Sequence, residues 1–108
     1  MALSKSFTLN SGASGDYTRL VTFRWDRSVR EAVALFALYL NAAAAQSGKE
    51  PLSPFIAKLR LTGDKFDQYL GNPTLAQADV VAQLYVAAKV EPLACDFGAN
   101  AFADAADV

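Results

Sequence analysis

The sequence predicts a small α+β protein, in which an antiparallel β-sheet of about four strands carries one C-terminal α-helix on a face. Three observations support this fold class. Apolar and polar residues alternate strictly along residues 17–26, which is typical of a strand with one buried face. Apolar residues recur at helical spacing along residues 75–90. Glycine, proline and small polar residues separate these segments, which indicates turns between them.

The chain of 108 residues has the length of a single domain. We place this α+β domain at residues 1–92 and expect the alanine-rich residues 93–108 to form a C-terminal tail. Hydrophobic residues make up 53% of the chain and charged residues only 19%. So few charges leave much of a small surface apolar, which suggests that a partner covers part of it. An alanine-rich domain that is soluble by itself is the alternative interpretation.

The first two strands are expected at residues 3–9 and 17–26, joined by a loop rich in glycine and serine. Aromatic and β-branched side chains fill the second strand and suit a pleated, half-buried surface. Strict alternation would place five side chains on one face of it: Tyr17, Arg19, Val21, Phe23 and Trp25.

Residues 29–45 have two interpretations. Alanine, leucine and glutamate favour a helix from Arg30 to Ala45. The continuous apolar run of residues 33–40 is instead typical of a strand buried on both faces. We favour a strand over residues 29–40 and a short helical turn over residues 41–46, because the short link after residue 26 suits a hairpin.

The second half of the chain is expected to contain a strand, a loop and a helix. Residues 56–62 alternate again, with Ala57, Leu59 and Leu61 on the apolar face. Residues 66–70 are short and aromatic, and we expect a loop that plugs the core. The helix over residues 75–90 begins at a capping box formed by Thr74 and Gln77, and Pro92 ends it.

Composition excludes several kinds of chemistry. The net charge of −1 gives no electrostatic basis for binding nucleic acid or an anionic membrane. The chain has no histidine, which rules out Ser-His-Asp and Cys-His catalysis within one chain, and the lone Cys95 rules out an internal disulfide. No enzyme activity, cofactor or metal is expected. The N-terminus lacks the apolar core of a signal peptide, so we expect the protein in a cytoplasm or in a particle assembled there.

Three residues of the second strand form a possible ligand platform: Tyr17, Arg19 and Trp25. Aromatic rings with a neighbouring arginine can stack on a sugar or a base. Aromatic residues at a spacing of two on one strand are also typical of a protein core, so both interpretations stay open at this point.

Four short motifs follow one another in a fixed order. Residues 5–19 contain a lysine, Phe-Thr-Leu, a glycine-rich loop and Tyr-x-Arg. An apolar strand at residues 33–39 precedes Gly-Lys-x-Pro-Leu at residues 48–52, and the chain ends on Phe-x-x-Ala-x-Asp-Val at residues 102–108. This layout resembles a group of small proteins encoded among the tail genes of bacteriophages and prophages. The chain departs from that group after residues 88–92, where it has an alanine-rich insertion.

The resemblance implies a structural protein of the virion, located at the tail tip, the baseplate or the fibre attachment region. It implies no catalytic residues, and we expect contacts with other virion proteins and with further copies of the chain. Edge strands and extended termini often make such contacts, which indicates interface residues in the first strand and the tail: Leu3, Phe7, Leu9, Phe97, Phe102 and Val108. The alternatives are a capsid decoration protein and a carbohydrate-binding module at a fibre tip.

Overall fold

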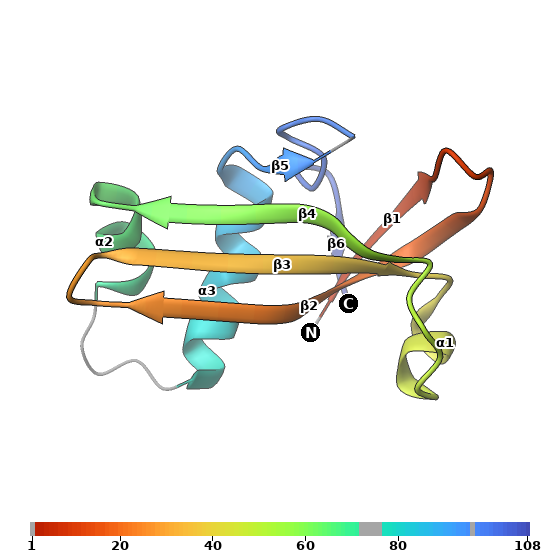
Figure 1. Cartoon of the computed structure of the whole chain (residues 1–108), viewed down its shortest axis with the longest axis horizontal. Coiled ribbons are helices and arrows are strands. Elements are labelled where there is room, and N and C mark those ends of the chain that lie inside the picture. The colour runs from red at the N-terminus through yellow and green to blue at the C-terminus, as the bar shows by residue number, and fades with distance from the viewer. Residues whose placement is uncertain (1, 72–76, 96) are drawn as a thin grey trace.

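A computed structural model describes residues 2–71, 77–95 and 97–108 (Figure 1). These residues form one antiparallel sheet of six strands in the order β5-β4-β3-β2-β1-β6. In chain order the elements are β1 (Leu3–Thr8), β2 (Ser14–Asp26), β3 (Glu31–Tyr39), α1 (Ala42–Gln46), β4 (Ser53–Thr62), α2 (Asp64–Leu70), α3 (Gln77–Val90), β5 (Ala94–Cys95) and β6 (Ala106–Asp107). The predicted α+β class is confirmed, with more strands and helices than expected.

The central hairpin joins β2 and β3, and its register runs from Tyr17 opposite Tyr39 to Asp26 opposite Glu31. The strand interpretation of residues 29–40 is therefore confirmed. β3 is covered by β2 on one side and β4 on the other, and burial of its apolar run overrides the helical propensity of alanine and leucine. The expected helical turn follows as α1, whose first turn is capped by the Asn41 side chain.

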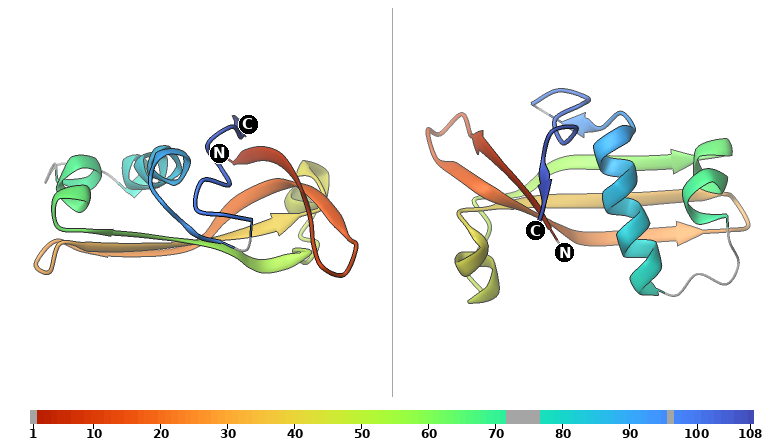
Figure 2. Two further views of the ribbon diagram at one scale, coloured as in Figure 1. Left: turned by 90° about the horizontal axis from the view of Figure 1, so that it is seen from above. Right: turned by 180° about the vertical axis from the view of Figure 1, so that it is seen from behind.

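The core lies between one face of the sheet and a layer made of α2, α3 and the C-terminal segment (Figure 2). Val80, Leu84 and Ala87 form the buried stripe of α3, as their helical spacing predicted. Ala57, Leu59 and Leu61 of β4 are buried in the same core, while the alternate residues of β4 between them are exposed, again as predicted.

The prediction that alternate residues from Tyr17 to Trp25 share one face of β2 is wrong, because the strand contains a β-bulge between Leu20 and Thr22. One extra residue at this point reverses the alternation, so that the side chains after the bulge point to the other face. Leu20, Phe23 and Trp25 lie opposite Phe36, Ala34 and Ala32, on the core face. Tyr17 and Arg19 lie on the opposite face.

Residues 66–70 belong to a helix, α2, and not to the expected loop. Phe66, Tyr69 and Leu70 share its buried face, so the segment does fill the core. Glu91 is buried and directly follows α3. Its carboxylate accepts a hydrogen bond from the Tyr69 hydroxyl (2.9 Å) and forms an ion pair with the Lys65 ammonium group (3.1 Å). These contacts join the ends of α2 and α3. The predicted capping box of α3 includes Thr74, which lies outside the described residues.

Residues 93–108 return to the sheet and supply the two short strands beyond the expected four. β5 pairs with Ala57 and Lys58 of β4, and β6 pairs with Leu3 and Ser4 of β1. Phe102 is fully buried, with its ring 5.4 Å from that of Phe36. The C-terminal segment is therefore part of the core. Among the described residues, no helix has the length and apolar character needed to span a membrane.

Thr18 gives a first test of this core. Its side chain is fully buried and its hydroxyl has no hydrogen-bond partner among the described residues. Replacing the hydroxyl by a methyl group removes that unsatisfied polar atom, so Thr18→Val should raise the free energy of unfolding by about 1 kcal/mol in urea titrations. Thr22→Val, on the exposed face, is the control and should change little. A less stable Thr18→Val variant would contradict this account of the core.

The Glu91 contacts give a second test, through pH. Hydrogen bonds from Lys65 and Tyr69 lower the pKa of Glu91 below its ordinary value of 4.5. A carboxyl with a lowered folded-state pKa stabilises the protein above the unfolded-state pKa, and this contribution is lost as the pH falls through the folded-state pKa. At pH 7, Glu91→Gln should lower the free energy of unfolding by about 1 kcal/mol.

The difference between Glu91→Gln and the unaltered chain should shrink as the pH falls through the lowered pKa of Glu91. Urea titrations at a series of pH values measure it. Glu50→Gln, in an exposed loop, is the matched control and should change the free energy of unfolding little. A difference that is constant with pH would mean that the charge of Glu91 does not stabilise the contact between α2 and α3.

Candidate functional site

The outer edge of β2 is open along residues 19–26. β1 pairs only with the first part of β2, as far as Thr18, whereas β3 pairs with the whole length from Tyr17 to Asp26. Among the described residues, no strand pairs with β2 beyond Thr18 on the side away from β3. A strand edge of this length presents backbone N–H and C=O groups to which another extended chain can pair.

The buried Tyr85 of α3 holds this edge at the bulge. The backbone N–H of Leu20 donates a hydrogen bond to the Tyr85 hydroxyl, with 2.6 Å between the nitrogen and oxygen atoms. Burial raises the pKa of Tyr85, so its phenol stays neutral at physiological pH and remains an acceptor for this N–H. The contact fixes the distance between α3 and the edge, so the two elements form the sides of a preformed groove.

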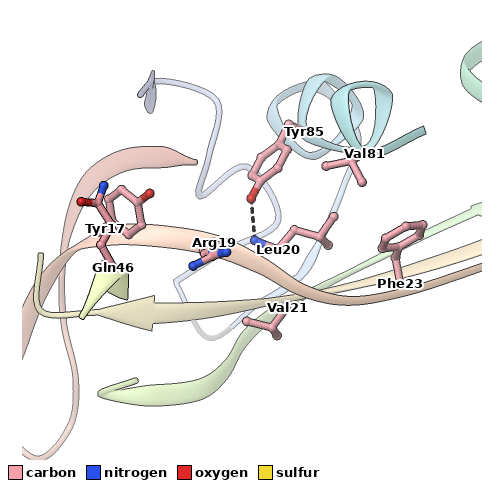
Figure 3. Close-up of a pocket in the computed structure, with 8 residues that line it drawn as sticks. All are labelled: Tyr17, Arg19, Leu20, Val21, Phe23, Gln46, Val81 and Tyr85. Carbon is pink, nitrogen blue, oxygen red and sulfur yellow. Dashed lines mark hydrogen bonds between the residues drawn. The ribbon is translucent and has the colours of Figure 1, made fainter. Parts of the chain in front are cut away.

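A hollow of about 420 Å³ lies along this groove, between β2, α3 and α1 (Figure 3). In the close-up, Leu20 and Phe23 point toward α3, and Val81 and Tyr85 approach them from the helix. Leu20, Phe23 and Val81 are only partly buried, so apolar surface remains accessible there. Tyr17, Arg19 and Gln46 line the end of the hollow nearest α1.

Arginines give the open face beside this edge a positive charge. Arg24 and Arg60 share one carboxylate, that of Glu31, and the Arg24 side chain is 78% exposed. The hydrogen bond from Arg60, followed by the charges around it, lowers the pKa of Glu31. Arg19 is exposed and makes no ion pair with any described residue. Asp26 lies on the same face and keeps its negative charge while its carboxylate accepts hydrogen bonds from Ser28, so it balances only part of the charge of Arg19 and Arg24.

The structure separates the three residues of the expected ligand platform. Tyr17 and Arg19 lie on the open face, whereas Trp25 lies on the core face, because the bulge falls between them. The Arg27 guanidinium covers the ring of Trp25 at 4.6 Å from its centroid. The three side chains therefore form no common stacking surface, and of the three only Tyr17 and Arg19 line the groove.

The six expected interface residues have three different environments. Leu3, Phe7 and Phe102 are buried inside the protein's own core, so they present no surface to a partner in this fold. Leu9 is half-buried against that core. Phe97 and Val108 are 36% and 58% exposed, although the ring of Phe97 packs on Phe7 and the backbone of Val108 pairs with Ala2.

The groove combines an unpaired strand edge with partly buried apolar side chains and one arginine, Arg19. In the described part of the chain, no three His, Cys, Asp or Glu side chains come close enough to hold a metal ion. Sequence reasoning missed the contributions of Val81, Tyr85 and Gln46. These residues come from elements far apart in the chain, and nothing in their local spacing indicates that they meet at β2.

Comparisons with protein-family models, with curated proteins and with solved structures found no match to this chain.

The hydrogen bond between Leu20 and Tyr85 can be tested directly. Tyr85→Phe keeps the ring and removes the acceptor, so the Leu20 amide should exchange with solvent about tenfold faster by NMR. The matched control is Tyr39→Phe, because Tyr39 pairs with Tyr17 and not with Leu20, and this change should leave the exchange of Leu20 unchanged. Equal exchange in Tyr85→Phe and the unaltered chain would mean that α3 does not hold this edge.

Proposed function

We propose that this protein is a structural component of a bacteriophage particle and acts through protein–protein contacts. Its place is in the tail region, at the tip, the baseplate or the attachment of the fibres. The order of the sequence motifs supports the phage origin, and the open outer edge of β2 supports the mode of action. This edge is the single observation on which the contact-making role rests.

Several properties of the edge suit a permanent contact in an assembled particle. A partner strand would satisfy the backbone groups of residues 19–26 and cover the accessible apolar surface of Leu20, Phe23 and Val81. We infer that the partners are other virion proteins, together with further copies of this chain in the same particle. Membrane and nucleic acid have no part in the proposed role.

The proposal predicts that the protein is present in purified particles. Particles should be induced from the genome that encodes this chain, banded on a density gradient and analysed by quantitative mass spectrometry. We expect the chain in a fixed ratio to the tail proteins in every particle fraction. Its absence from the particles, or a ratio that varies between fractions, would contradict a structural role.

Antibody labelling of the same particles then locates the protein. We expect labelling at the tail and loss of the label from tailless heads after the two are separated. Labelling of the capsid would replace the tail assignment by a decoration role. A matched preparation from a deletion strain, complemented with the unaltered chain, is the control for antibody specificity.

A further inference from the structure

We propose that the groove between β2 and α3 binds an extended acidic segment of a neighbouring virion protein, which adds to the sheet as a strand along residues 19–26. This inference rests on the proposed function and specifies the chemistry of the partner. It is carried by three observations: the unpaired edge, the accessible apolar surface below α3, and the positive charge on the opposite face.

The first argument for the site comes from the unpaired backbone groups of β2. Beyond Leu20, whose N–H is already bonded to Tyr85, the outward groups of β2 have no strand partner among the described residues. The N-terminal end of α3 extends past β2 in the views of Figures 1 and 2, so a chain laid along the edge would pass beneath the helix. This arrangement favours an extended segment, because the space beside the edge is bounded by the helix on one face.

The two faces of the edge determine the side chains of the segment. In an added strand, successive side chains point alternately to the two faces of the sheet. Those on the core face would meet Leu20, Phe23 and Val81, which favours apolar residues. Those on the open face would meet Arg19 and Arg24, which favours glutamate or aspartate. The segment should therefore alternate apolar and acidic residues.

Charge also favours an acidic segment over a second copy of the chain at this edge. Residues 19–26 carry two arginines, Arg19 and Arg24, and one carboxylate, that of Asp26, so a second copy would add further net positive charge to the edge. Glutamate or aspartate at the open-face positions of an added segment would instead balance that charge.

A designed peptide tests the chemistry on the full chain. The probe is a fluorescein-labelled, capped ten-residue peptide that alternates valine or threonine with glutamate. Fluorescence anisotropy should show saturable binding that weakens as salt is added. Amide shifts in NMR should be confined to residues 19–26 and the facing part of α3. The first control peptide has lysine in place of every glutamate, and the second has the same composition in scrambled order.

Backbone pairing and charge are then separated. A peptide with N-methyl groups at alternate residues loses the hydrogen bonds of one edge, and its binding should be abolished when those bonds face β2. In the protein, Arg19→Glu should weaken binding of the glutamate peptide roughly tenfold, because it replaces an attraction by a repulsion. Lys49→Glu makes the same charge change in an exposed loop and should leave the affinity nearly unchanged.

Several outcomes would overturn this inference. They are an absence of saturable binding, equal affinity for the lysine or scrambled peptide, equal affinity of both N-methylated forms, and shifts located away from β2. A dimer formed by the chain alone through residues 19–26 would overturn it in favour of a second copy. Detection of the protein in particles is a separate measurement, so the virion role survives if this binding site fails.

Discussion

The bulge in β2 is the constraint on which the rest of the structure depends. β2 has 13 residues and runs past two different parts of the protein. Its first part lies between β1 and β3, and its second part has β3 on one side only. One extra residue between Leu20 and Thr22 turns Phe23 and Trp25 toward the core. Without it, these aromatic rings would share the exposed face with Arg19.

The same bulge links packing to the candidate site. Beside the bulge, where β1 no longer pairs with β2, the outward Leu20 N–H has no strand partner, and Tyr85 of α3 supplies the acceptor. The helix is therefore attached to the edge of the sheet as well as to its face, where Val80 and Leu84 are buried. Both contacts hold α3 beside β2, and a groove formed in advance would lower the cost of ordering an extended chain there.

Local patterns predicted those parts of the fold that depend on neighbours in sequence. The buried face of β4, the stripe of α3 and the strand over Glu31–Tyr39 all follow from periodicity and run length. The bulge did not, because strict alternation continues through residues 17–26 and only pairing with β3 reveals the extra residue. Phe102 was expected at an interface for a similar reason: a lone aromatic residue in an alanine-rich segment carries no sign of the core it enters.

The edges of β1 and β4 are partly covered, and this contrast suggests that the open edge of β2 has a function. The C-terminal segment covers part of β1 with β6 and part of β4 with β5, although each of these strands is only two residues long. A chain that uses its own terminus to cover two edges has the means to protect a third. Residues 19–26 instead carry two arginines and one aspartate, a net positive charge that increases when identical edges pair and that an acidic strand would balance. Under the proposal made above, this charge makes an acidic partner a better match for the edge than another copy of the chain.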